Sequence, residues 1–294
     1  MSSSAESTPP SAERRPVARA ALVTHGRPEQ VGDGVERLVS LARRIGVELI
    51  VTPDEAAQHG LEAHGDPADA ELVVVLGGDG TMLRALRMYL GTGVPVLGVN
   101  FGRVGFLSSM QPAELEAGLG RAFSGELVTF ELPTLEVELG PGSVDADADR
   151  VAVNDVVVTS GELGRMVELE WAVGGEDLGR VPCDGLICST PSGSTAYNLS
   201  NGGPVLMWGI DALATTFVAP HSLHARPLVV PRGTEVVVWN RTAHVPVVVL
   251  VDGHRIGEAG GDGRIEVRLG DAYSLLATLP EATFVRRYRE SFST

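Results

Sequence analysis

Up to about residue 125, short apolar runs alternate with stretches whose apolar residues recur every three or four positions. A continuous apolar run is typical of a strand covered on both faces, and such runs occur at 20–23, 47–51, 72–76 and 94–99. The three- and four-residue spacing is typical of amphipathic helices, which we expect at 31–45, 82–90 and 112–123. Between them, 52–69 is expected to be a loop. Strands alternating with helices predict a parallel α/β layer.

The pattern changes after residue 128 to an alternation of apolar and polar residues, rich in β-branched side chains. Such alternation predicts half-buried strands, most clearly at 135–139, 167–171, 235–239 and 247–251. Turns rich in Gly, Pro and Asp separate these strands, which favours an antiparallel sandwich. The last segment, 282–292, returns to helical spacing, with Phe284, Val285, Tyr288 and Phe292 on one face.

We therefore predict a fold of class α/β plus all-β. An N-terminal parallel α/β layered domain, 17–128, is expected to precede an antiparallel β-sandwich-like domain, 129–280. The C-terminal helix within 281–294 is expected to return to the first domain. Residues 1–16 are rich in Ser, Pro, Glu and Ala and have almost nothing to bury, so we expect a disordered tail.

The composition excludes several kinds of phosphate chemistry. The chain has 294 residues, and all 23 of its basic residues are arginine, so it contains no lysine. Without lysine, the chain cannot form a Walker-type phosphate loop, a Schiff base, or the ATP site of a protein kinase.

The charge and the cysteine content limit the partners and the compartment. A net charge of −15 disfavours binding to nucleic acid and to a membrane surface. The chain has two cysteines, Cys183 and Cys188, too few for a disulfide framework and not spaced as a metal pair. No segment has the apolar length of a membrane span or a signal sequence. We expect a soluble, cytoplasmic protein without protein metal ligands.

A glycine-rich turn joins the predicted strand at 72–76 to the helix after it, with the sequence LGGDGT at 76–81. Glycine lets the backbone approach a ligand closely, and the start of a helix favours a phosphate. Asp79 has the wrong charge for a phosphate ligand, so it is a candidate base or acceptor for a substrate hydroxyl. The alternative is a tight turn in which Asp79 caps the helix.

A second polar segment, DGLICSTPSGSTAYNLSNGGP, covers 184–204. So many hydroxyls and small residues suit a loop that wraps a hydroxyl-rich ligand. Tyr197 is a candidate wall for a nucleotide base, and Thr195 offers a hydroxyl to the edge of its ring. The alternative is an ordinary solvated loop.

Together with other motifs, these two segments resemble the NAD kinase family. The further motifs are NFGRVGFL at 100–107, ND at 154–155, PHSLHARPLV at 220–229, VDG at 251–253 and RRYRESF at 286–292. The resemblance implies transfer of the γ-phosphoryl of ATP, or of polyphosphate, to the 2′-hydroxyl of the adenosine ribose of NAD, which gives NADP. A lipid kinase with a GGDGT loop and a non-catalytic dinucleotide sensor are the alternatives.

The resemblance also implies roles for individual residues. Asp79 corresponds to the aspartate that accepts the hydroxyl proton. Asp155 stands where the family has Glu, His254 stands where many members have Gln, and Asp184 corresponds to an aspartate that often faces the nicotinamide from a neighbouring subunit. The nucleotide-binding positions implied are Gly80, Arg84, Asn154, Asp155, Arg165, Asp184, Thr195, Ala196, Tyr197, Asn198, Leu199, Ser200, Ala219 and His254.

The cofactors and partners follow from the same resemblance. Mg²⁺ is expected to accompany ATP, and the chain is expected to form a homodimer or homotetramer. Asp252, in the VDG motif, is either an acidic partner for the second nucleotide or a hairpin-turn aspartate. The preference for NAD or NADH and for ATP or polyphosphate stays open.

Overall fold

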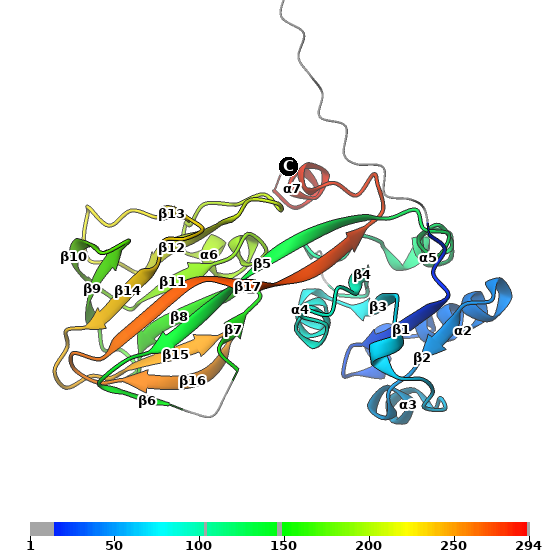
Figure 1. Ribbon diagram of the computed structural model, residues 1–294, viewed down its shortest axis with the longest axis horizontal. Coiled ribbons are helices and arrows are strands. Elements are labelled where there is room, and N and C mark those ends of the chain that lie inside the picture. The colour runs from blue at the N-terminus through cyan, green and yellow to red at the C-terminus, as the bar shows by residue number, and fades with distance from the viewer. Residues whose placement is uncertain (1–14, 103–104, 146–148, 293–294) are drawn as a thin grey trace, which may run out of the picture.

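The computed structural model describes residues 15–102, 105–145 and 149–292, so nearly all of the tail expected at 1–16 lies outside the described residues. The described strands form two sheets, one of ten strands and one of seven (Figure 1). The parallel strands and most helices occupy one half of the molecule, and the antiparallel strands occupy the other.

The α/β half is built on four parallel strands in the order β4-β3-β1-β2. Their bounds are Arg19–Thr24 (β1), Glu48–Ile50 (β2), Leu72–Gly77 (β3) and Pro95–Asn100 (β4). Every residue of β3 is buried, as expected for a strand covered on both faces. The helices that cover these strands are Pro28–Val31 (α1), Gly34–Ile45 (α2), Pro53–His59 (α3), Asp79–Met88 (α4) and Leu115–Phe123 (α5), with 3-10 turns at Pro67–Asp69 (η1) and Pro112–Glu114 (η2).

The β half is a sandwich of antiparallel strands. On one side, the ten-stranded sheet continues through Val128–Leu139 (β5), Val151–Ala152 (β7), Val167–Val173 (β9), Glu176–Cys183 (β10), Val236–Asn240 (β14) and Arg264–Thr278 (β17). The seven-stranded sheet consists of Ser143–Asp145 (β6), Asp155–Ser160 (β8), Gly185–Ser189 (β11), Ala212–Val218 (β12), Leu228–Pro231 (β13), Val247–Val251 (β15) and His254–Ala259 (β16). Apolar side chains from both sheets form one core between them.

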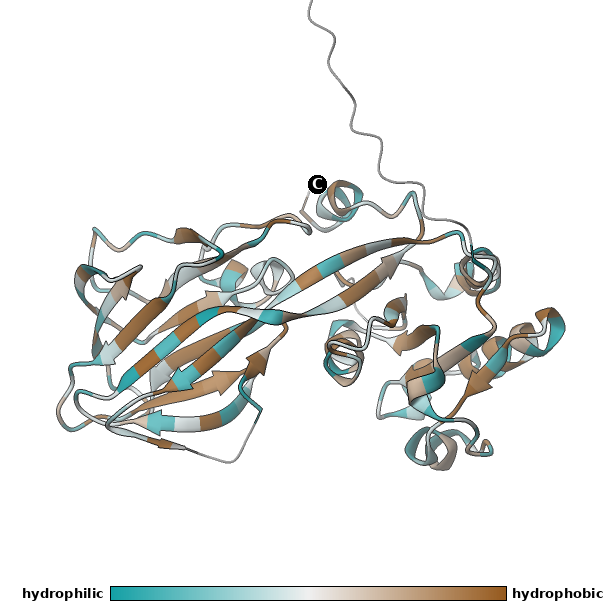
Figure 2. Cartoon of the chain, in the orientation of Figure 1, coloured by the Kyte–Doolittle hydropathy of each residue, from teal (hydrophilic) through white to brown (hydrophobic). Residues whose placement is uncertain are grey.

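The two halves share their longest strands. β17 pairs antiparallel with β14 at one end, where Val236 faces Val267, and parallel with β4 at the other, where Leu276 faces Val96. β5 runs beside β17 along nearly its whole length, and in Figure 2 both strands alternate between hydrophilic and hydrophobic colours. This continuous sheet fixes the sandwich relative to the α/β layer.

The C-terminal helix α7, Phe284–Phe292, packs where the halves meet (Figure 1). The Phe284 ring lies 5.1 Å from that of Phe106 and 5.3 Å from that of Trp208, centroid to centroid. Phe284 belongs to the same buried cluster as Met82 of α4, so the helix returns to the α/β half as predicted.

Two predicted elements differ from the structure. The expected loop 52–69 contains helix α3, which starts where the Thr52 hydroxyl accepts a hydrogen bond from the Glu55 N–H and Pro53 occupies the first turn. The single helix expected over 31–45 is interrupted at Gly32, whose φ of 56° ends α1 before α2 begins. The domain boundaries at 128 and 280 stay a prediction, since β5 and β17 belong to both halves.

Candidate active site

The glycine turn brings two backbone segments into close contact. β3 ends at Gly77, Gly78 is the N-cap residue, and α4 begins at Asp79. A Cβ atom on Gly77 would lie 2.4 Å from the Thr81 hydroxyl oxygen, and one on Gly102 would lie 3.3 Å from the Gly78 Cα. Gly77 is therefore needed for the turn itself, and Gly102 allows the chain that follows β4 to approach it closely.

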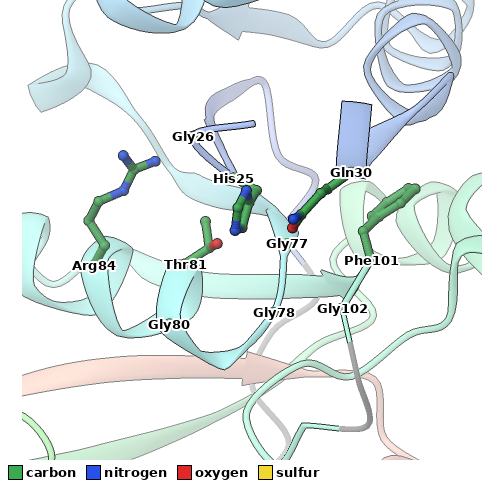
Figure 3. A pocket seen from close by; sticks show the side chains of 10 residues that line it. All are labelled: His25, Gly26, Gln30, Gly77, Gly78, Gly80, Thr81, Arg84, Phe101 and Gly102. Atoms are coloured by element: carbon green, nitrogen blue, oxygen red, sulfur yellow. The ribbon is translucent and has the colours of Figure 1, made fainter. Parts of the chain in front are cut away.

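A cavity of about 350 Å³ lies beside this turn, and we call it the glycine cavity. Its lining residues are His25, Gly26, Gln30, Gly77, Gly78, Gly80, Thr81, Arg84, Phe101 and Gly102 (Figure 3). None of these lining residues is acidic, and Arg84 contributes a positive charge. Together with the positive end of α4, this lining suits an anionic group such as a phosphate.

A buried carboxylate anchors Arg84 at the rim of the glycine cavity. The Arg84 Nη2 donates to the Thr24 carbonyl at 2.5 Å and to Glu55 Oε1 at 3.3 Å. Glu55 is buried and accepts a hydrogen bond from the Thr24 N–H at 2.9 Å. The Arg84 side chain stays 46% exposed, so this anchored guanidinium can still meet a ligand.

Asp79 does not cap its own helix, so the alternative interpretation of this residue is wrong. Gly78 occupies the N-cap position, and the Asp79 carboxylate accepts hydrogen bonds from the N–H groups of Phe106 at 2.7 Å and Leu107 at 3.1 Å. A second cavity of about 300 Å³, the Asp79 cavity, is lined by Asp79, Gly105, Phe106, Thr195, Glu290, Ser291 and Phe292. The carboxylate is thus fixed by backbone donors beside a space that Thr195 also lines.

Most of the hydroxyls in the polar segment after β11 form hydrogen bonds within the protein, either inside the segment or to the Val153 carbonyl. The hydroxyls of Thr190 and Ser192 donate to the Val153 carbonyl at 2.6 and 2.8 Å. The Ser194 hydroxyl donates to the Pro191 carbonyl at 2.7 Å and accepts from the Leu206 N–H at 2.9 Å. The expectation that these hydroxyls wrap a ligand is therefore wrong for this buried subset.

A smaller group on the same segment faces outward. Gly193–Thr195 forms the turn η3 and Tyr197–Ser200 forms the short helix α6, with Ala196 between them. Ala196, Tyr197 and Ser200 are exposed, while Thr195 and Leu199 are half-buried. Asn198 is buried, and its amide donates to the carbonyls of Ser194 and Pro204 while its oxygen accepts from Thr216. The role of all these residues in nucleotide binding stays a prediction. Because the Asn198 side chain is fully used in these internal hydrogen bonds, only its backbone atoms could contact a nucleotide.

Asp252 organises the backbone at the start of β8. Its carboxylate accepts hydrogen bonds from the N–H groups of Val153, Asn154 and Asp155 at 2.9, 2.8 and 3.1 Å. Arg87 of α4 donates to the same carboxylate at 3.1 Å. Asp252 is therefore a hairpin-turn aspartate between β15 and β16, and with its side chain fully buried it is not available to a second nucleotide.

Two of the three residues that Asp252 holds, Asn154 and Asp155, have side chains in unusual buried environments. The side-chain oxygen of Asn154 is buried and has no hydrogen-bond partner among the described residues. Buried acceptors are rarely left unpaired, so this oxygen suits a ligand donor such as an amino group. Asp155 is buried. Burial is the larger cause that raises the pKa of Asp155 to about 7, and repulsion from the Asp252 carboxylate is the smaller one.

This raised pKa predicts a pH-dependent stability. An unfolded aspartate titrates near 4, so between pH 4 and 7 the folded chain holds one more proton at Asp155 than the unfolded chain. The stabilisation is complete below pH 4 and is lost as the pH rises through 7. Asp155→Asn should therefore gain stability relative to wild type on going from pH 5 to pH 8, by about 2–3 kcal/mol.

Urea denaturation of both proteins at pH 5 and pH 8 measures this difference. Asp184→Asn, at an exposed carboxylate, is the control and should follow wild type at both pH values. Parallel pH dependences of wild type and Asp155→Asn would contradict the assigned protonation.

Apart from Gly80 and Arg84, which belong to α4, the implied nucleotide residues fall into two groups at opposite ends of the seven-stranded sheet. In the pairing of β8 with β11, Asp155 faces Ser189 at one end and Thr159 faces Gly185 at the other. Asn154, Asp155 and the polar segment lie at the first end, and His254 is close to it, because Val251 pairs with both His254 and Val156. The second group lies at the other end and consists of Arg165, Asp184 and Ala219, all of them exposed.

Several lining residues were not found from the sequence. His25 and Gln30 follow β1, and Phe101 follows β4, so all three lie at the carboxyl edge of the parallel strands. Ligands of open α/β sheets bind at this edge, and this rule was the available signal. Among the described residues, neither a cluster of three or more metal-ligating side chains nor a helix long and apolar enough to cross a membrane occurs.

Family models match both halves of the chain. The model described as the ATP-NAD kinase N-terminal domain matches residues 38–127, and that of the ATP-NAD kinase C-terminal domain matches residues 153–279. The NAD kinase of Heliobacterium modesticaldum is 41% identical over 220 residues, covering 75% of this chain and 77% of its own. The NAD kinase of Thermobifida fusca is 33% identical over 286 residues, covering 95% of this chain and 86% of its own.

Two solved structures resemble the whole arrangement. Yeast NADH kinase in complex with NADH superposes with a TM-score of 0.81 at 25% identity, covering 98% of this chain and 93% of its own. The NAD kinase of Archaeoglobus fulgidus in complex with ATP has a TM-score of 0.70 at 26% identity, covering 92% of this chain and 99% of its own.

Proposed function

This chain belongs to the NAD kinase family, and from that premise we propose how it makes NADP: the γ-phosphoryl group of ATP moves to the 2′-hydroxyl of the adenosine ribose of NAD, with Asp79 as the base. The observation that carries this assignment is the position of Asp79. Its carboxylate borders the Asp79 cavity, while Gly78 and Gly80 on either side of it line the glycine cavity. A donor in one cavity and an acceptor in the other would meet at this residue.

The glycine cavity suits the triphosphate of the donor. Glycine backbone allows close approach, and the start of α4 and Arg84 offer hydrogen-bond donors and positive charge to the phosphate oxygens. Mg²⁺ would enter with ATP, since this ion commonly keeps several waters and binds through substrate phosphates with one or two carboxylates. Bound to these phosphates, Mg²⁺ would neutralise part of their charge.

The Asp79 cavity suits the adenosine ribose of NAD. Tyr197, 46% exposed, offers a ring face to the adenine, and the unpaired oxygen of Asn154 offers an acceptor to its amino group. With the 2′-hydroxyl directed at the Asp79 carboxylate, the proton passes to Asp79 as the hydroxyl oxygen bonds to phosphorus. The bond from phosphorus to the leaving oxygen of ADP breaks in line.

A second copy of the chain would complete the dinucleotide site. Arg165, Asp184 and Ala219 lie at the end of the sheet opposite Asn154 and Asp155, and exposed apolar side chains accompany them, with Leu163 and Leu223 almost wholly in solvent. We infer that the chain forms at least a homodimer in which this end meets the nucleotide of a partner. A cytoplasmic location fits the two buried, unpaired cysteines.

Mixing two inactive variants tests the shared site. In a dimer of Asp79→Asn with Asp184→Ala, one site carries both changes and the other carries neither. Co-expression should therefore recover about a quarter of wild-type activity, the value for random pairing in a two-fold dimer. Activity no higher than that of the two variants alone would contradict sharing across the interface.

A coupled assay of NADP formation tests the reaction itself. The purified protein is supplied with Mg²⁺, with ATP or polyphosphate as donor, and with NAD, NADH or diacylglycerol as acceptor. We expect phosphorylation of the dinucleotide and none of the lipid. Dinucleotide binding without phosphorylation from either donor would favour the sensor, and phosphorylated diacylglycerol would favour the lipid kinase.

A further inference from the structure

Arg287 of α7 is a buried cation whose hydrogen bonds are incomplete. The residue is 5% exposed, its Nη1 donates to the Phe106 carbonyl at 2.5 Å, and its guanidinium carbon lies 5.0 Å from the centre of the Trp208 ring. The Nε and Nη2 atoms are buried and have no hydrogen-bond partner among the described residues. Burying a charge with unpaired donors is costly, so its retention needs a compensating interaction.

The Asp79 carboxylate is the opposite charge that acts on Arg287. Burial lowers the pKa of Arg287 to about 10, and attraction to Asp79 is the largest effect that opposes this change. Arg287 therefore carries its charge at neutral pH. Phe106 joins the two side chains directly, because its carbonyl accepts from Arg287 while its N–H donates to Asp79 at 2.7 Å.

We propose that Arg287 is a positioning residue for the Asp79 base, which it serves in two ways. Through the Phe106 carbonyl it holds the segment whose N–H groups orient the Asp79 carboxylate. Through its positive charge it attracts that carboxylate. The inference rests on the proposed reaction. It gives helix α7 a role in that reaction, although none of the implied nucleotide-binding positions lies on this helix.

The groups around Asp79 show what removal of Arg287 would leave at the cavity. α7 contributes Arg287 and Glu290, and Glu290 lines the Asp79 cavity while its carboxylate accepts from Arg286 Nε at 2.8 Å. The segment that binds Asp79 contributes backbone N–H groups, and Phe284 and Trp208 pack as uncharged rings. Removal of Arg287 thus leaves the Phe106 carbonyl without its side-chain donor and the two carboxylates without their buried cation.

Arg287→Met, Arg287→Lys and Arg289→Met test the proposal in the full-length protein. Met fills the space beside Trp208 without a charge, and Lys keeps the positive charge but lacks the planar guanidinium group. Arg289 is an exposed arginine on the same helix and serves as the control. For Arg287→Met we expect kcat to fall about 10²-fold, the size that a small misplacement of a catalytic group produces, with KM for NAD and ATP changed less than about threefold.

The split between kcat and KM separates positioning of the base from support of the nucleotide sites. In Arg287→Lys, part of the turnover should return with KM still near the wild-type value, because the ammonium can keep the hydrogen bond to the Phe106 carbonyl. Arg289→Met should match wild type throughout.

A wild-type kcat in Arg287→Met would overturn the proposal, as would a rise in KM without a fall in kcat, which marks lost binding and not a displaced base. If thermal melting shows that Arg287→Met is unfolded, Arg287→Lys decides: a reduced kcat with KM near the wild-type value supports the proposal, and a wild-type kcat refutes it. Absence of NADP formation by the wild-type protein is a distinct result and would refute the proposed function instead.

Discussion

Asp79→Asn is expected to lower kcat by about 10²–10⁴-fold, the contribution typical of a positioned general base. The amide has the same shape as the carboxylate but cannot take up the proton of the 2′-hydroxyl. KM for NAD and ATP should change little, because the variant keeps both cavities. The loss should therefore appear in kcat and kcat/KM alike, as for an interaction made only in the transition state.

The control for this change is Asp54→Asn, at an exposed aspartate in the first turn of α3. In Asp79→Asn, the NH₂ of the introduced amide has to face one of the two N–H donors that now serve the carboxylate, so a destabilisation of about 1–3 kcal/mol is expected. Thermal melting measures this cost separately. Full turnover in a folded Asp79→Asn protein would remove Asp79 from the mechanism.

Gly105→Ala is expected to lower kcat about 10²-fold, although it neither adds nor removes a titratable group. A Cβ atom at this position would lie 2.2 Å from Asp79 Oδ1 and 2.7 Å from its carboxylate carbon, both far inside van der Waals contact. Because the carboxylate and the 105–107 segment hold each other, one of them has to shift. A displacement of about 1 Å at the base is enough for a loss of this size.

Gly120→Ala is the matched control, since a Cβ atom there meets nothing within 4 Å and the residue lies within helix α5. That variant should be as active as wild type and slightly more stable. The double variant Gly105→Ala with Asp79→Asn should be scarcely less active than Asp79→Asn alone, because both changes act on one group. If the two fold-losses in kcat multiply in the double variant, Gly105 acts on a group other than Asp79.

The sequence predicted the elements of the fold wherever its periodicity was long and regular. The apolar run of β3 and the GGDGT turn after it placed Asp79 at a strand-to-helix junction, and α4 does start there. Helix α3 was missed because its start signal, Thr52 followed by Pro53, precedes only seven residues of helix. The pairing of β17 with β4 was beyond reach, since residues 95 and 275 become neighbours only through long-range topology.

The candidate site shows the same limit. Motif residues such as Asp79 and Thr195 line the Asp79 cavity, but the sequence could not distinguish hydroxyls that fold the polar segment from those that remain exposed. Asp252 was open between two roles, and only its three backbone contacts decide between them. Gly105 and Arg287 act on Asp79 from elements distant in the sequence, and no local pattern shows such contacts.

The central claim is that Asp79 meets the 2′-hydroxyl of the adenosine ribose inside the Asp79 cavity. A crystal structure of the protein with NAD bound measures this most directly. We expect the 2′-oxygen within hydrogen-bond distance of an Asp79 carboxylate oxygen, about 2.6–3.2 Å, with the adenine beside Tyr197. An ordered adenosine ribose whose 2′-oxygen lies beyond reach of Asp79, even through one water, would contradict the account.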